Sequence, residues 1–108
     1  MAGFPGSDIK GQYTQTRLSV TNNSSSETEH KFQKGVKAFM VICNEFEIVR
    51  VSWASGEVDD SSGVWFLLYP REPYSEENLY LTDDNRRSLW MNAPDAAASV
   101  IVYILEWR

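Results

Sequence analysis

Short apolar segments alternate with polar, turn-rich segments along the whole chain. Within most apolar segments, large side chains return at every second position, which is the period of a β-strand. Clusters of Gly, Pro, Asn, Asp and Ser separate these segments at intervals of about 8–12 residues. The pattern predicts seven or eight short strands, within residues 16–21, 36–43, 46–53, 64–69, 78–82, 89–92 and 98–107.

No segment combines the 3.6-residue period of an amphipathic helix with the usual length of a helix. Short strands joined by frequent turns are typical of sandwiches, jelly rolls and barrels. The predicted fold is therefore an all-β, antiparallel β-sandwich or jelly-roll-like domain over residues 14–108. Residues 1–13, which include three glycines and a proline, predict an extended N-terminal arm.

The arm carries three large apolar side chains, those of Phe4, Ile9 and Tyr13. A disordered, solvated tail is the simpler interpretation of such a segment. A solvated tail has little need of large apolar residues, whereas an arm that docks on a partner does need them. Both interpretations stay open from the sequence.

Three of the predicted strands, at 36–43, 64–69 and 98–107, are apolar on both faces. In the last of them Val100 and Val102 occupy one face, and Ile101 and Tyr103 the other. A sandwich strand normally buries one face only. The second face therefore needs cover from the arm, from loops or from another subunit, and we expect a homo-oligomer.

The prolines Pro70 and Pro73 interrupt the chain after the fourth apolar segment and predict an exposed loop. Within it, Arg71 lies between Tyr69 and Tyr74. Tyr and Arg are enriched at the hot spots of protein interfaces. The loop is a candidate interface, although a plain surface loop explains the same residues equally well.

The chain carries 10 basic and 15 acidic residues, for a net charge of −5. A dominant nucleic-acid binder needs a basic face, so the balance opposes that class. No stretch approaches the 18 apolar residues of a membrane span. The first residues lack the basic and apolar regions of a signal peptide, so we expect assembly in a cytosol.

Candidate catalytic chemistry is sparse. The single cysteine, Cys43, lies in an apolar run and is expected to be a buried, inert thiol. The single histidine, His30, follows the polar segment 22–29 and is expected in a loop. One His and one Cys do not make a zinc site, and a cupin-type metal enzyme needs several histidines. No Gly-x-Ser-x-Gly elbow and no phosphate-binding Gly-rich loop occurs. We expect no cofactor, no metal and no enzyme activity.

Carboxylates cluster in three turn-rich stretches, at 57–60, 76–77 and 83–84, where solvated loop charge is the simplest interpretation. A paired-carboxylate glycosidase is a remote option in so short a chain. Surface tryptophans are a second feature, because Trp53, Trp65 or Trp90 could form a platform for a sugar ring. A carbohydrate-binding or lectin-like adhesin module is therefore the alternative function.

The order of segments over 35–108 resembles the small virion proteins of tailed bacteriophages, the capsid decoration or cement proteins and related head-fibre or tail accessory proteins. The resemblance lies in FEIVRVSW at 46–53, an acidic Gly/Ser loop, NLYLT at 78–82, SLWMNAP at 88–94 and the closing SVIVYILEWR at 99–108. It implies a β-sandwich or jelly-roll body, frequent assembly as trimers, and arms that extend the contact with capsid subunits. It transfers no active site.

The resulting hypothesis is a structural virion protein that binds and stabilises an assembled capsid, assembled in the host cytoplasm. Its expected partners are further copies of the chain, as a trimer, and the major capsid protein or another virion protein. Nucleic acid and membrane are not expected partners. The candidate interface residues are Phe4, Ile9, Tyr13, Tyr69, Arg71, Tyr74, Ile101, Tyr103 and Trp107.

Overall fold

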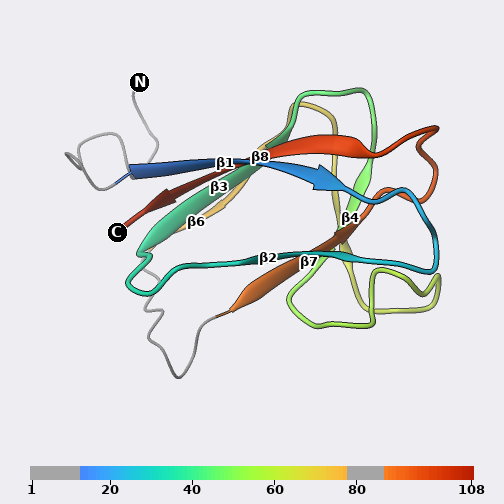
Figure 1. Ribbon diagram of the computed structural model, residues 1–108, viewed down its shortest axis with the longest axis horizontal. Helices are drawn as coiled ribbons and strands as arrows, with labels where there is room; N and C mark the ends of the chain where they lie inside the picture. Colours follow the sequence, from blue (N-terminus) through green and yellow to red (C-terminus); the bar gives the residue numbers. More distant parts are fainter. Residues whose placement is uncertain (1–12, 78–86) are drawn as a thin grey trace.

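Eight β-strands and no helix make up the part of the chain that the computed structural model describes, residues 13–77 and 87–108. Figure 1 shows them as two layers of a sandwich. The strands are β1 (Tyr13–Val20), β2 (Thr28–Lys31), β3 (Ala38–Cys43), β4 (Val49–Ser52), β5 (Phe66–Leu68), β6 (Tyr74–Glu76), β7 (Ser88–Asn92) and β8 (Val100–Trp107).

The strands form two four-stranded sheets, with the order β1-β8-β3-β6 in one and β2-β7-β4-β5 in the other. Every pairing is antiparallel, and most join strands that are far apart in the sequence. Apart from β4 and β5, which pair with each other, consecutive strands lie in different sheets. This repeated crossing between two antiparallel sheets is the connectivity of a jelly roll, and it agrees with the predicted fold class.

Alternation along the strands decides which side chains enter the space between the sheets. On β8, Val100, Val102 and Ile104 are buried, whereas Ile101 and Tyr103 are part-exposed on the outer face. The same alternation recurs on β2 and on β3 from Phe39 to Cys43. The core is apolar, and its largest members are Phe32, Phe39, Leu68, Leu89, Met91 and Ile104. Among the residues described, none forms a helix of the length and apolarity needed to cross a membrane.

Cys43 lies on the inner face of β3 and is fully buried, as expected. Its Sγ is 3.6 Å from the carbonyl oxygen of Glu45, to which it donates a weak hydrogen bond. Burial raises the pKa of the Cys43 thiol, and the carboxylates of Glu45 and Glu47 act in the same direction. The thiolate needed for nucleophilic chemistry is therefore disfavoured.

Two segments predicted to be loops are strands in the structure. The polar segment ends in β2, whose residues Thr28–Lys31 pair with β7, so the loop expected for His30 is wrong. The exposed loop at 69–74 ends at β6, which begins with Tyr74. Pro73 is compatible with that strand because it lies just before β6, and β6 is at the edge of its sheet. The strand and turn predicted within 78–85 and the arm up to residue 12 lie outside the described residues.

Candidate functional site

Two loops meet at one end of the β2-β7-β4-β5 sheet. The loop between β1 and β2 is anchored by the buried Asn92 on β7, whose amide nitrogen donates to the carbonyl oxygens of Asn23, at 2.7 Å, and of Ser26. The Glu27 carboxylate accepts hydrogen bonds from the Gly56 nitrogen at 2.7 Å and the Ser55 hydroxyl at 2.8 Å. Glu27 therefore ties this loop to the long connection between β4 and β5.

The β4–β5 connection, residues 53–65, folds back on itself. The Glu57 carboxylate accepts the backbone N–H of Val64 at 2.8 Å, and the Gly63 nitrogen donates to the Asp60 carbonyl at 2.9 Å. The backbone approach is so close that a Cβ at Gly63 would lie 2.1 Å from the Glu57 carbonyl oxygen. The side chain of Val58 is fully buried and anchors the loop to the protein interior. The loop is therefore held in one shape by its own bonds.

Asp60 shapes the tip of the same loop. Its Oδ1 accepts hydrogen bonds from the backbone and hydroxyl of Ser62, at 3.0 Å and 2.9 Å. These bonds, with a smaller contribution from the charge of Arg50, lower the pKa of Asp60. Asp60 is therefore a carboxylate at neutral pH, with one oxygen engaged by its own loop.

An apolar groove opens between the ends of β4 and β5. Its volume is about 420 Å³, and its walls include Trp53, Trp65, Phe66, Val64 and the acidic side chain of Glu57. We call it the indole groove. The Trp65 indole N–H donates to the Asp60 carbonyl at 3.1 Å, and the Arg50 guanidinium lies 4.4 Å from the ring centroid. Both contacts fix the plane of the Trp65 ring.

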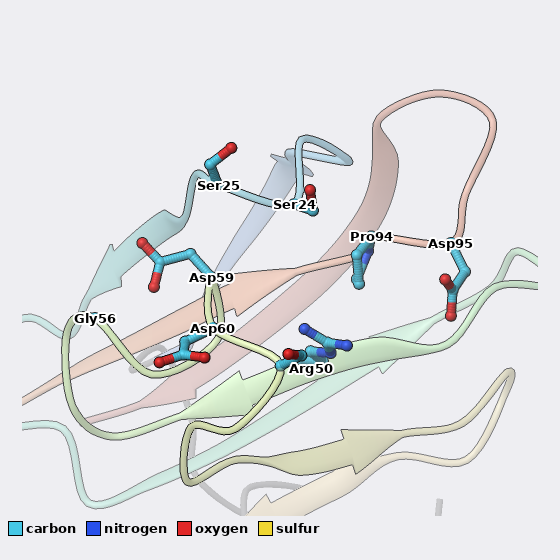
Figure 2. Close-up of a pocket in the computed structure, with 9 residues that line it drawn as sticks. Ser24, Ser25, Arg50, Gly56, Asp59, Asp60, Pro94 and Asp95 are labelled. Atoms are coloured by element: carbon cyan, nitrogen blue, oxygen red, sulfur yellow. The ribbon is translucent and has the colours of Figure 1, made fainter.

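A second, larger and polar hollow of about 740 Å³ is bounded by another part of the β4–β5 connection, and Arg50 lines it. It is called the polar hollow here, and it is lined by Ser24, Ser25, Arg50, Gly56, Asp59, Asp60, Ser61, Pro94 and Asp95. Figure 2 shows that the carboxylates of Asp59, Asp60 and Asp95 point in different directions and do not converge on one point. Within the described residues, no three His, Cys, Asp or Glu side chains come together in a metal-binding arrangement.

Exposed apolar side chains gather on the outer face of the β4–β5 pair. Phe46 is 77% exposed, Tyr69 46%, Ile48 45% and Leu67 37%. These residues, with Arg71, form what we call the hairpin surface. Because Val49 pairs with Leu68, the next position places Ile48 beside Tyr69. Exposed apolar residues that are contiguous in this way mark interaction sites more often than scattered ones do.

Arg71 completes the hairpin surface through its backbone conformation. Its φ is 61°, and the Glu72 nitrogen donates to the Tyr69 carbonyl at 3.2 Å. A turn with Pro at its second position and a positive φ at its third is type II. The turn places the Arg71 guanidinium 4.6 Å from the centroid of the Phe46 ring. The predicted pair Tyr69 and Arg71 is thus brought together with apolar residues from the preceding loop.

The outer face of the other sheet is also apolar at its centre. Met40 and Ile42 on β3 pair with Leu105 and Tyr103 on β8, and all four side chains are part-exposed. With Ile101 they form what we call the sheet surface. It covers the two central strands, and β1 contributes the polar side chains of Gln15, Arg17 and Ser19 beside it. Because they lie on the outward positions of different sheets, the two apolar surfaces are on opposite outer faces of the sandwich.

The remaining predicted interface residues are placed differently. Phe4 and Ile9 lie outside the described residues, and Tyr13 is the first residue of β1, paired with Trp107. The Trp107 side chain is 2% exposed and offers almost no surface to a partner. The Tyr74 ring is half-buried against Phe39 and Phe66, with ring centroids 5.7 Å and 4.7 Å apart, so its expected exposed position is wrong.

A buried pair of ionisable groups links the two sheets. His30 Nε2 lies 2.6 Å from Glu106 Oε1, and these side chains are 11% and 2% exposed. The Gln33 backbone nitrogen lies 3.4 Å from the other Glu106 oxygen, and the His30 ring meets Phe32 edge-on at 5.1 Å. The sequence carried a signal for this pair. Glu106 follows Val100, Val102 and Ile104 at the two-residue spacing of inward positions.

Tyr74 has a strongly perturbed phenol. Its hydroxyl donates to a carboxylate oxygen of Glu76, and burial, followed by this hydrogen bond and the charge of Glu76, raises the pKa of Tyr74 to about 12. The ordinary value is 10.0. Between these pH values, the folded state keeps a proton that the unfolded chain releases.

We therefore expect the stabilising effect of neutral Tyr74 to be complete below pH 10 and to be lost as the pH rises to about 12. Urea unfolding of the protein and of the Tyr74→Phe variant across this range measures the effect. The free energy of unfolding of the wild type minus that of Tyr74→Phe should fall as the pH rises from 10 to about 12. A difference that does not change with pH would contradict the expected shift.

Comparisons with known proteins bear on the fold. No family model matches the chain, and no curated protein matches it. The Cupin_2 domain of an XRE family transcriptional regulator from Enterobacter cloacae matches 90% of this chain and 82% of its own, with a TM-score of 0.56 and 13% identity. A de novo designed double-stranded β-helix matches 88% of this chain and 99% of its own, with a TM-score of 0.52 and 16% identity. The fold is thus a cupin-like double-stranded β-helix, a jelly-roll-like sandwich, which confirms the predicted fold class.

Proposed function

We propose that the protein is a structural assembly protein, and most concretely a virion protein that binds and stabilises an assembled capsid. The observation that carries the proposal is the presence of two apolar surfaces on opposite outer faces of the sandwich. A protein that reinforces an assembly must contact at least two neighbours at once. Two separate surfaces meet that requirement, whereas a protein that binds one partner needs one.

The two surfaces suit different partners. The sheet surface is regular and contains Met40, Ile42, Ile101, Tyr103 and Leu105, and its apolar centre fits the interface between copies of one chain. The hairpin surface protrudes, and it presents two aromatic rings and an arginine, the residue types enriched at hot spots. We assign the sheet surface to contacts between copies in a trimer and the hairpin surface to the particle.

The assignment of the sheet surface predicts the effect of a charge placed on it. Leu105→Glu should raise the dissociation constant of the oligomer at least about 100-fold, because an unpaired carboxylate would be buried between the copies. Light scattering at micromolar concentration should give a trimer for the wild type and a monomer for the variant.

Ala97→Glu is the matched control, since it adds the same charge at an exposed position between β7 and β8. It should leave the trimer intact, and thermal melts should show that both variants fold. A monomeric wild type, or equal dissociation of both variants, would refute the role of the sheet surface.

The capsid role is tested on the particle itself. Quantitative mass spectrometry of particles purified from the virus that encodes the chain should find it at a fixed ratio to the major capsid protein. Co-sedimentation with particles that lack the chain should be saturable for the wild type and lost for Leu67→Glu on the hairpin surface. Absence of the chain from the particles would overturn the proposal.

A further inference from the structure

We propose that the indole groove and the adjoining polar hollow together bind a neutral carbohydrate chain, a function beyond the assembly role. The two spaces are linked through Arg50, which lines the polar hollow and lies 4.4 Å from the centroid of Trp65, a wall of the groove. Indole rings line the groove, and carboxylate and hydroxyl groups line the hollow. A sugar chain can use both, because the apolar C–H faces of each sugar ring stack on indoles and its hydroxyl groups form hydrogen bonds.

The size of the site suits several sugar rings. The groove measures about 420 Å³ and the polar hollow about 740 Å³, and ligand pockets commonly span about 300–1,000 Å³. Both spaces are lined by residues of the connection at 53–65. A linear chain could therefore lay one ring on the Trp65 indole and place the following rings in the polar hollow.

The charges around the site favour a neutral ligand. Glu57 in the groove and Asp59, Asp60 and Asp95 in the hollow disfavour an anion, such as a nucleic acid or a sulfated glycan. Arg50 lies 4.4 Å from the Trp65 centroid and Arg87 lies 5.7 Å from that of Trp53, so a ligand that stacks on either indole must take ring surface that the arginine does not cover. A neutral ligand avoids the repulsion that the carboxylates exert on an anion.

The site is also organised before any ligand arrives. The Trp65 ring is held by its bond to the Asp60 carbonyl and by Arg50, and the Glu57 carboxylate is oriented by the Val64 N–H. Trp53 is held from the core side by Phe32 and Phe39, with ring centroids 5.9 Å and 5.8 Å away. Groups that are already fixed lose little entropy on binding. Glu57 and Asp59 then offer acceptors to sugar hydroxyls.

The test uses the full chain and three neutral hexasaccharides: cellohexaose, xylohexaose and the hexamer of β-1,4-linked N-acetylglucosamine. We expect at least one of them to bind saturably, with a dissociation constant below about 1 mM, and to change the tryptophan fluorescence. Trp65→Ala should weaken that binding at least about tenfold. A sulfated hexasaccharide should bind more weakly than the best neutral one.

Tyr69→Ala is the matched control, because it removes an exposed aromatic ring from the same strand pair outside the groove. It should leave sugar affinity unchanged, and Trp65→Phe should retain part of it. The inference is overturned if none of the three neutral sugars binds saturably, or if Trp65→Ala binds as the wild type does. Leu105→Glu, which tests the assembly role, lies on the other sheet and away from both spaces, so it separates the two proposals. Leu67→Glu does not, because Leu67 pairs with Arg50.

Discussion

Replacing His30 by leucine should lower the free energy of unfolding by about 1–3 kcal/mol, because a buried carboxyl group loses its closest hydrogen-bond partner. The variant removes the imidazole that lies 2.6 Å from Glu106, whose side chain is 2% exposed. The Glu106 carboxyl group would keep its longer contact with the Gln33 nitrogen, at 3.4 Å. The loss is a large fraction of the total, because domains of this size are stable by about 5–15 kcal/mol. Urea unfolding followed by tryptophan fluorescence measures the change.

The double variant His30→Leu/Glu106→Leu separates the lost polar contact from packing. It removes the buried carboxyl group as well, and apolar replacement of both members of a buried polar pair can be nearly neutral or stabilising. We expect it to regain most of the stability lost in the single variant. If the double variant were as unstable as His30→Leu alone, the loss would come from packing, and the account of an unpartnered buried carboxyl group would be wrong.

The residues that face the core could be predicted from the alternation of apolar side chains along each apolar strand. On β8 the apolar residues Val100, Val102 and Ile104 define the inner face without knowledge of the partner strands. The same alternation gave the outer residues Ile101 and Tyr103, which the structure places on one surface. Cys43 was predictable for the same reason, since it ends an apolar run and lies two positions after the inward-facing Val41.

The strands β2 and β6 were not predictable in this way. Each is short and largely polar, and each forms by pairing with a strand more than 30 positions away, β7 in one case and β3 in the other. Local propensity is weak in such segments, and tertiary context decides. His30 and Tyr74 were therefore assigned to loops, although both side chains are held by buried partners.

The candidate site shows a similar division. Trp53, Trp65 and Trp90 were the possible sugar platforms in the sequence, and the structure places the first two in one groove that Trp90 does not line. The polar hollow could not be found, because its walls come from three separate connections that Glu27 and Asn92 hold in place. Hydrogen bonds between loops that are remote in sequence produce no periodic pattern of apolar and polar residues, so the sequence alone does not predict them.

Aromatic rings fill the space between the sheets and reach the groove. Phe39 on β3 is fully buried and lies at the centre of this cluster. Its ring centroid is 4.7 Å from that of Phe32, 5.8 Å from Trp53 and 5.7 Å from Tyr74. Phe39 therefore connects the two sheets and supports the inner side of Trp53, which also lines the indole groove.

Phe39→Ala should lower the free energy of unfolding by about 3–5 kcal/mol, through lost burial and the cavity left behind. Phe39→Leu keeps most of the volume and should cost about 1.5 kcal/mol or less. Urea unfolding gives both values, and an unchanged m-value would show that the transition remains two-state. Because Trp53 loses its support, Phe39→Ala should also weaken sugar binding under folding conditions, whereas Phe39→Leu should not. Equal stability of the two variants would show that the cluster collapses around the missing ring, and that Trp53 does not depend on it.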